Sequence, residues 1–506
     1  MKRIVAITLA LILCLSLAAC GQSTSVKSSK PEVNDAVVAK YDSDGIAYIP
    51  LMDGNIAKID DEVFRASVTP DRKHIVVLTL DGVLYYTGAD QAEKTQISEK
   101  GDAISAVADE GILYQDADNN YHRFLFADGS DVNIGKVTTY KRSTNGLHIA
   151  FETNSTVYIL YGNAQEKEKL GNVTNSCKIL YVSDDGKTVY WNDYKNYEET
   201  IFASVNGEKT KVGTFDTSSK YVNTSFTHNE TKKYAVFTNI YSDVMYVVPE
   251  NGEPLKIKLG HELASSRVYT KSGLLRKDTS SAFPGIYVSV EGSDGNNLYY
   301  IDAEGEKEKV LSEIGSYTIY DNTLYYVDED SNLKIAKIED ATLTNEEKVT
   351  GDVEILDETK CIDGYIFFVK DYFSKDSTGI LYAYKKGSDP VKITSDVFSY
   401  KNFGCIIGTS SPDGKTIYFY KDLEEISGTY RSSAVLYKYT YGDSEPTRIA
   451  SDVVVGTIDS GYTTGLINNN SFIYFKYSSV KDEEIIGDWF FFNGTDSKQM
   501  ATDVKG

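Results

Sequence analysis

The fold of this chain is decided by one short stretch, Ser411-Pro412-Asp413-Gly414-Lys415-Thr416-Ile417-Tyr418-Phe419, in which a tight turn leads into an apolar strand. Proline presets the backbone angle of the first corner, aspartate accepts hydrogen bonds from the backbone, and glycine supplies a left-handed residue before the strand. The same order of turn and strand returns at 69–77, 143–151 and 183–191. Recurrence of one such unit along the chain indicates a repeat architecture.

A second repeated form is a strand rich in leucine and tyrosine that ends in an acidic or glycine turn. It occurs at 83–88, 297–302, 323–328, 380–384 and 434–439. A short polar segment follows several of these strands, as at 94–98, 391–394 and 447–450. These segments suit outer edge strands, because charge on an exposed edge discourages pairing with another chain.

The composition also favours strands. The chain has 506 residues, with 39 tyrosines and 20 phenylalanines but nine prolines, and aromatic side chains suit the half-buried surface of a sheet. Helical periodicity is hard to find, and the nearest candidate, 422–426, is more consistent with a loop. Repeated units of about 40 residues with four short strands predict an all-β fold, a β-propeller built of four-stranded blades.

About ten blade-like units can be counted within residues 37–506, together with a partial unit at 46–51. Propellers usually carry about 4 to 8 blades, so two arrangements stay open. The chain forms one large ring, or two rings in tandem that divide near 264–277, where the pattern is least regular. The partial unit is a candidate to complete a final blade containing Trp489-Phe490-Phe491-Phe492, which would close the ring by pairing the two ends.

The repeats resemble two known groups of propellers. The Ser-Pro-Asp-Gly-Lys-x-Ile form at 411–417 is similar to TolB-type repeats. The form Leu-Tyr-Tyr-x-Asp at 298–302 is similar to the repeat of the YWTD class, with tyrosine in place of tryptophan. Only the unit at 189–193 keeps the tryptophan. The resemblance covers nearly all of 37–503 through short motifs and implies the propeller fold. For TolB-type proteins it further implies work with a membrane partner.

The N-terminus carries a different signal. Two basic residues precede an unbroken apolar stretch at 4–15, and Leu17-Ala18-Ala19-Cys20 follows. These are the parts of a secretory signal peptide, and the apolar part is shorter than the roughly 20 residues that a spanning helix needs. The stretch resembles the lipobox of bacterial lipoproteins. That family implies cleavage after Ala19 and a lipid anchor on Cys20, made of a diacylglyceryl thioether and acyl chains such as palmitate.

We therefore expect a signal peptide at 1–19, the lipidated Cys20 with a flexible tether at 20–36, and the propeller region at 37–506. The tether is rich in serine and poor in aromatic residues, so it cannot bury enough apolar area to become ordered. The protein is then expected outside the cytoplasm, anchored to the cell membrane by lipid. Gly21 leaves open which membrane is the destination in a cell with two.

Charge and cysteine content narrow the possible partners. The formal net charge is −22, and loss of the two basic residues of the signal peptide makes it −24. Such a surface repels phosphates, which argues against nucleic acid as a partner. The body of the chain has three single cysteines, Cys177, Cys361 and Cys405. Their spacing favours neither a disulfide framework nor a zinc site.

No catalytic or metal site stands out, and no cofactor is indicated. The nearest approach to a G-x-S-x-G nucleophile elbow, at 408–412, ends in proline. Asp328, Asp330, Asn332 and Glu339 match ligand positions of an EF-hand loop, but Leu333 stands where glycine is required, so an acidic hairpin is favoured over a calcium site. No i, i+4 helical pair suited to a metal is found among the histidines, which are His74, His122, His148, His228 and His261.

The sequence favours a non-catalytic binding platform for a protein, a peptide or a glycan. Tyrosines of the repeated strands, such as Tyr85, Tyr299 and Tyr325, are expected to pack between blades rather than to contact a ligand. Two alternatives stay open: a carbohydrate-active enzyme, glycosidase or lyase, with an acidic propeller channel, and an envelope assembly or sensor component of the TolB type. Three or more polar side chains with shifted pKa values in one pocket would favour the enzyme.

Overall fold

The computed structural model describes residues 37–42, 45–51, 54–216, 224–250, 253–265, 267–293, 295–401, 404–457 and 470–505. These residues form 45 strands and one 3-10 helix, η1 (Leu275–Lys277), so the predicted all-β class is confirmed. Within these ranges no helix is long and apolar enough to cross a membrane. The predicted signal peptide, Cys20 and the tether up to residue 36 lie outside the described residues.

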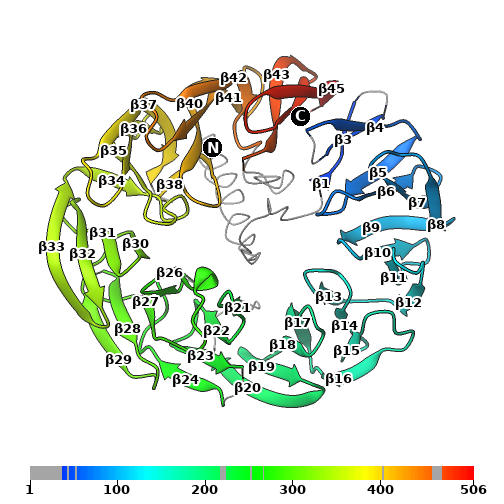
Figure 1. Ribbon diagram of the computed structural model, residues 1–506, viewed down its shortest axis with the longest axis horizontal. Coiled ribbons are helices and arrows are strands. Elements are labelled where there is room, and N and C mark those ends of the chain that lie inside the picture. The colour runs from blue at the N-terminus through cyan, green and yellow to red at the C-terminus, as the bar shows by residue number, and fades with distance from the viewer. Residues whose placement is uncertain are drawn as a thin grey trace.

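Figure 1 shows the strands following one another around a single ring in chain order. Of the two arrangements that the sequence left open, the structure thus has the large ring. The segment 264–277, where a division was possible, contributes two strands and η1 to this same ring. The strands from the N-terminus to the middle of the ring are β1 (Val37–Val38), β2 (Lys40–Tyr41), β3 (Ala47–Pro50), β4 (Ile56–Ile59), β5 (Val63–Val68), β6 (His74–Thr79), β7 (Leu84–Gly88), β8 (Lys94–Ser98), β9 (Gly101–Val107), β10 (Gly111–Asp116), β11 (Tyr121–Leu125), β12 (Asp131–Gly135), β13 (Thr139–Arg142), β14 (Ile149–Thr153), β15 (Thr156–Leu160), β16 (Glu168–Asn172), β17 (Ser176–Val182), β18 (Thr188–Lys195), β19 (Glu198–Val205), β20 (Glu208–Asp216), β21 (Thr224–His228), β22 (Tyr234–Asn239), β23 (Val244–Pro249) and β24 (Leu255–Lys258).

The second half of the ring continues in the same way. Its strands are β25 (Tyr269–Thr270), β26 (Gly273–Leu274), β27 (Ile286–Val290), β28 (Asn297–Ile301), β29 (Lys307–Leu311), β30 (Tyr317–Tyr320), β31 (Thr323–Val327), β32 (Leu333–Glu339), β33 (Thr342–Thr350), β34 (Val353–Leu356), β35 (Ile366–Phe373), β36 (Thr378–Tyr384), β37 (Val391–Tyr400), β38 (Cys405–Ile406), β39 (Gly408–Ser410), β40 (Thr416–Glu425), β41 (Ser432–Thr440), β42 (Thr447–Val454), β43 (Phe472–Lys481), β44 (Glu484–Phe492) and β45 (Ser497–Lys505).

The blades are antiparallel sheets in which consecutive strands pair. Five sheets have four strands each, as in β17-β18-β19-β20. The largest sheet joins three blade-like groups, β34–β37, β39–β42 and β43–β45, through single residue pairs, Val397 with Lys421 and Val453 with Lys476. The described strands therefore confirm four-stranded units repeated about as often as the sequence predicts. Apolar side chains of neighbouring blades form the cores between them, as Leu180 and Phe215 do with Phe237.

The turns of every blade fall on two opposite edges of the ring. First-to-second and third-to-fourth strand turns share one edge, which we call the turn face; it holds 69–73, 143–148, 183–187 and 411–415. There the Asn206 N–H donates to the Lys187 carbonyl (2.8 Å). Second-to-third strand hairpins and the links between blades share the other edge, the hairpin face. There the Leu80 N–H donates to the Glu62 carbonyl (2.9 Å).

The repeated Ser-Pro-Asp-Gly turn has the conformation that its residues predict. The Lys415 N–H donates to Asp413 Oδ1 (3.0 Å), and the Thr416 N–H donates to Ser411 Oγ (2.9 Å). Gly414 has a φ of +68°, and a Cβ there would lie 2.4 Å from the Ile362 carbonyl oxygen. Glycine is therefore required both by the left-handed backbone and by the close approach of the neighbouring blade.

Turns on the turn face are also tied to one another. Asp184 accepts a hydrogen bond from the Thr144 N–H (2.8 Å) of the preceding blade and binds Lys232 Nζ (3.0 Å) of the following blade. In the same way the Asp71 N–H donates to Asp109 Oδ1 (2.8 Å) of the next blade. Asp184 and Asp109 on the turn face thus hold neighbouring blades together.

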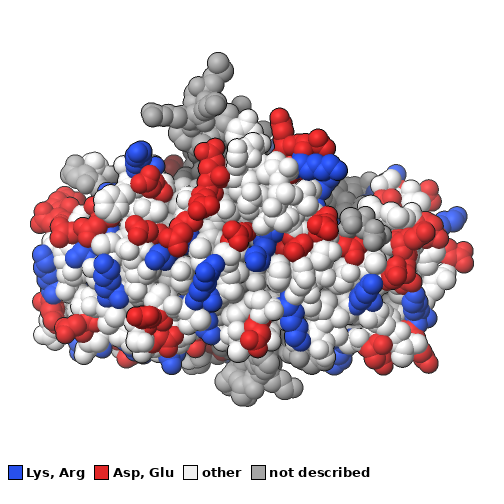
Figure 2. All heavy atoms as spheres, turned by 90° about the horizontal axis from the view of Figure 1, so that it is seen from above, with Lys and Arg blue, Asp and Glu red and all other residues white. Residues whose placement is uncertain are grey.

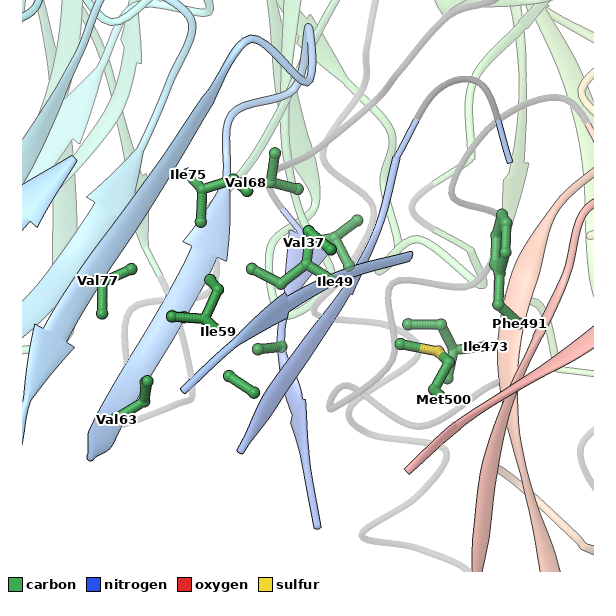
Figure 3. Packing of buried hydrophobic residues seen from close by; sticks show 14 of the residues in the cluster. Val37, Ile49, Ile59, Val63, Val68, Ile75, Val77, Ile473, Phe491 and Met500 are labelled. Carbon is green, nitrogen blue, oxygen red and sulfur yellow. The ribbon is translucent and has the colours of Figure 1, made fainter. Parts of the chain in front are cut away.

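The two ends of the chain meet by side-chain packing. Val37 and Ile49 share a core with Ile473, Phe491 and Met500 (Figure 3). Among the described strands, β2-β3-β4 form a sheet of their own and β1 pairs with β5. The prediction that the N-terminal unit pairs with the blade around Phe491 is therefore wrong. The N-terminal segment supplies enough strands for a separate small sheet, so the ring closes through side-chain contacts, which include this apolar core and a hydrogen bond from Lys498 Nζ to the Gly54 carbonyl (2.6 Å).

Tyrosines of the repeated strands are covered by lysines. Lys94 Nζ lies 5.1 Å from the Tyr85 ring centre, and Lys307 Nζ lies 4.5 Å from that of Tyr299. Tyr85 and Tyr325 are buried in cores, which confirms their predicted packing role. Figure 2 shows Lys and Arg side chains spaced along the visible side of the ring. Lysines on outer strands therefore cover aromatic rings that would otherwise face water.

Candidate functional site

Exposed large apolar side chains gather on the hairpin face. Leu80 and Tyr430 are 68% and 89% exposed, and both stand in second-to-third strand turns. Phe64, near the start of β5, lies beside the first of these turns. Among the described residues, only Val38 and Val391 are comparably exposed elsewhere. The exposed apolar residues of the hairpin turns are Leu80, Tyr197, Ile240, Tyr241, Phe373 and Tyr430.

Two of these turns are held together by a buried carboxylate. Glu199 is fully buried between the β17–β20 and β21–β24 blades. Its Oε2 accepts a hydrogen bond from Asn239 Nδ2 (2.8 Å), and its Oε1 accepts from Asn192 Nδ2 (2.5 Å) and from the Thr224 N–H (3.2 Å). Glu199 follows the tip of one hairpin and Asn239 precedes the tip of the next. The network therefore fixes the two tips relative to each other.

A hollow of about 510 Å³ opens beside these tips on the same face. It lies between the end of β20, the β22–β23 turn, the segment after β24 and the β27–β28 turn. The described residues of its lining include no Lys or Arg, and among the described residues none of its carboxylates has a Lys or Arg within ion-pair distance. The lining residues are Asp216, Tyr241, Asp243, His261, Glu262, Glu291, Gly292 and Ser293.

A second hollow, of about 230 Å³, lies near the inner side of the turn face. Lys277 Nζ crosses it to Asp363 Oδ1 (2.8 Å) and to the Pro412 carbonyl (3.3 Å), so this cation is already bound. Burial raises the pKa of the Cys361 thiol and of Tyr320, which both line the hollow.

An ion pair joins inner segments of the ring that are 91 residues apart. Arg267 Nη1 binds Glu358 Oε2 (2.7 Å), and Glu358 Oε1 accepts the Tyr317 N–H (3.0 Å). Burial raises the pKa of Glu358. The adjacent Asp357 is fully buried and accepts the Ile406 N–H (2.8 Å). These carboxylates are bonded to groups of neighbouring blades, and neither lines one of the two hollows.

The acidic hairpin at 328–332 is a closed turn. Asp328 Oδ1 accepts the Asn332 N–H (2.8 Å), and Lys334 Nζ lies 3.1 Å from Asp328 Oδ2. Glu339 stands at the far end of β32 and pairs with Lys337 (2.5 Å). The ammonium group of Lys334 thus stands beside Asp328 where a metal ion would be expected. The four residues that match EF-hand ligand positions are not brought together. No group of three or more metal-binding side chains is found in the described part of the chain.

The histidines and cysteines are dispersed around the ring. His122 lies between Asp116 and Asp131, with ring nitrogen to oxygen distances of 3.2 and 3.3 Å. His74 stacks on Phe126 with ring centres 4.4 Å apart. Of the described histidines, His261 alone lines a hollow. Among the described residues, no disulfide joins Cys177, Cys361 and Cys405.

Sequence reasoning missed the exposed residues of the hairpin turns. One signal for them was present, because Ile240-Tyr241 stands inside the polar turn Asn239-Ile240-Tyr241-Ser242-Asp243. Two adjacent apolar residues in a turn lie outside the blade core, so this pair could have been predicted to be exposed.

No protein-family model matches the chain, and no curated protein matches it. Among solved structures, the chain is similar to a eukaryotic initiation factor at 10% identity and a TM-score of 0.40, covering 78% of this chain and 96% of that one. It is similar to dipeptidyl peptidase 4 of Porphyromonas gingivalis at 14% identity and a TM-score of 0.37, covering 78% of this chain and 58% of that one. It is also similar to the tricorn protease at 10% identity and a TM-score of 0.27, covering 93% of this chain and 58% of that one. Likenesses with TM-scores this low carry no argument about the fold or the function of this chain.

Proposed function

We propose that this protein is a lipoprotein anchored at the cell surface whose propeller is a non-catalytic binding platform for a protein, a peptide or a glycan. The binding surface is the hairpin face. One observation carries the proposal: exposed Leu, Ile, Phe and Tyr side chains stand in the hairpin turns, while the repeated motif turns of the opposite face bond to one another. Burying a fully exposed Leu, Ile or Phe gains about 1.5–3 kcal/mol, and partly exposed side chains gain less, so contact with this face can stabilise a complex.

The point where the chain enters the ring supports this assignment of faces. β1 runs antiparallel to β5, and Val37 lies opposite Val68, beside the 69–73 turn. The chain therefore enters at the turn face. If Cys20 carries the lipid, the tether of 16 residues between it and Val37 spans at most about 55 Å, at roughly 3.4 Å per residue. The turn face is then directed to the membrane and the hairpin face is presented outward.

An array of peptides and glycans probed with the full-length protein in mild detergent tests the platform. We expect saturable binding to members of one ligand class. A variant with all six exposed hairpin residues changed to serine should lose that binding while its thermal unfolding stays unchanged. Binding that survives in this variant, or no binding to either class, would refute the proposal.

A second experiment tests the anchor and the orientation. Cys20→Ser should move the protein out of the membrane fraction. In spheroplasts, a membrane-impermeant maleimide should label Tyr430→Cys on the hairpin face faster than Lys187→Cys on the turn face, with the wild-type cysteines as background. Retention of Cys20→Ser in the membrane, or faster labelling at position 187, would contradict the proposal.

A further inference from the structure

The partner surface can be narrowed to one sector of the hairpin face, and this inference rests on the proposed function. Tyr197, Ile240 and Tyr241 are 46%, 38% and 38% exposed. They stand at the β18–β19 and β22–β23 tips that Glu199 holds together. The Tyr241 N–H also donates to Asn239 Oδ1 (2.9 Å), which fixes the start of the second tip. A partner can therefore bury these side chains without first ordering the turns.

The hollow beside the two tips sets the charge of the partner. Tyr241 belongs to both features, because it is a tip residue and also lines the hollow. The described lining carries four carboxylates, and Lys307 Nζ beside it donates to the Leu259 carbonyl, two residues before His261. An anionic partner would be repelled, and a neutral one would leave the carboxylates without a counter-charge.

We propose that the described residues of this sector, the β18–β19 and β22–β23 tips together with the lining of the hollow, are the docking surface for a basic segment of a protein partner. Lys or Arg side chains of that segment enter the hollow and meet Asp216, Asp243, Glu262 and Glu291. An apolar or aromatic side chain beside them packs on Tyr197, Ile240 and Tyr241. Charge then steers the encounter, and apolar contact supplies most of the affinity.

Three fluorescent peptides of twelve residues test the proposal by anisotropy with the full-length protein in mild detergent. One peptide alternates Lys with Trp, the second Glu with Trp and the third Lys with Ser. We expect the Lys/Trp peptide to bind at least about tenfold more tightly than either of the others, with affinity that falls as salt is added. Equal binding of the Glu/Trp peptide would overturn the proposal.

Paired variants locate the site. Asp243→Asn with Glu291→Gln, and separately Ile240→Ser with Tyr241→Ser, should each weaken the Lys/Trp peptide at least about tenfold. Val38→Ser and Val391→Ser, at exposed apolar residues outside the hairpin turns, are the matched controls and should leave affinity unchanged. Asp243→Lys with Glu291→Lys should gain affinity for the Glu/Trp peptide, a result that a misfolded variant cannot give. Equal losses in the control variants would overturn the proposal.

Failure of this inference is distinguishable from failure of the proposed function. Saturable glycan binding that is lost in Tyr241→Ser but kept in Asp243→Asn with Glu291→Gln would overturn the basic partner and leave the platform standing. Binding of a ligand that depends only on Tyr430 or Phe373 would also overturn the basic partner and leave the platform standing. If no ligand bound the hairpin face at all, both the inference and the proposed function would be overturned.

Discussion

The two faces of the ring use their turns in different ways. On the turn face, turns also bond to neighbouring blades, as Asp184 does toward Thr144 of the preceding blade and Lys232 of the following blade. On the hairpin face, turns such as 426–431 bond within themselves and leave Tyr430 in water. The sequence motif therefore marks the turns that build the ring. The residues available to a partner lie in turns that do not repeat.

Two glycines give the sharpest contrast between the faces. Gly414, on the turn face, would place a Cβ 2.4 Å from a backbone oxygen, whereas Gly428, on the hairpin face, has φ +83° and nothing within 4 Å. We expect Gly414→Ala to lower the free energy of unfolding by about 3 kcal/mol, because it adds a clash to the strain of a left-handed backbone. Gly428→Ala adds only the strain of the left-handed backbone, so it should lower the free energy of unfolding by about 1 kcal/mol. Urea unfolding measures both, and equal losses would break the comparison.

Two aspartates give a smaller contrast that depends on pH. Burial of Asp184 works against its charge, but Lys232 and the bonded N–H groups outweigh burial and lower the pKa of the carboxyl. We expect Asp184→Ala to cost about 1.5 kcal/mol near neutral pH. A lowered pKa stabilises the fold above the unfolded value and loses that effect as pH falls through the folded one.

The difference between Asp184→Ala and the wild type should therefore shrink below about pH 4. Asp243→Ala, on the hairpin face, should cost less than about 0.5 kcal/mol at every pH. Urea unfolding at pH 3.5 and pH 7.5 measures both variants. A cost for Asp184→Ala that does not change with pH would show that its charge plays no part.

The smallest effect is expected from the exposed side chains themselves. Tyr430→Ser and Leu80→Ser remove side chains that are 89% and 68% exposed. Each should change the free energy of unfolding by less than about 0.5 kcal/mol. Thermal unfolding measures this directly. A loss above about 1 kcal/mol would mean that these residues support the ring and are not kept for a partner.

The fold could be predicted from the sequence because its signals are local. A turn such as 411–415 needs only its own residues to bond Asp413 to the Lys415 N–H, and the strand that follows carries its own apolar pattern. The tyrosines at repeated positions could be assigned to packing for the same reason. Ring size was left open, and pairing of the two ends was predicted wrongly, because closure depends on contacts between residues such as Val37 and Met500 at opposite ends of the chain.

The candidate site could not be predicted because it is tertiary. Tyr197 and Ile240 are joined through Glu199 and Asn239, which are 40 residues apart. The hollow is assembled from three blades, and no single turn of the sequence shows four carboxylates together. The pairing of Arg267 with Glu358 was hidden in the same way. The residues of the candidate site differ from the many other acids and tyrosines of the chain in their exposure in the folded ring, and not in residue type.

Photo-crosslinking in living cells tests the difference between the faces most directly. A benzophenone amino acid would replace Tyr241 or Tyr430 on the hairpin face, and Lys187 or Lys415 on the turn face, in otherwise full-length protein. Our account predicts discrete crosslinked products from the hairpin-face positions and none from the turn-face positions. Products from positions 187 and 415, with none from 241 and 430, would contradict it.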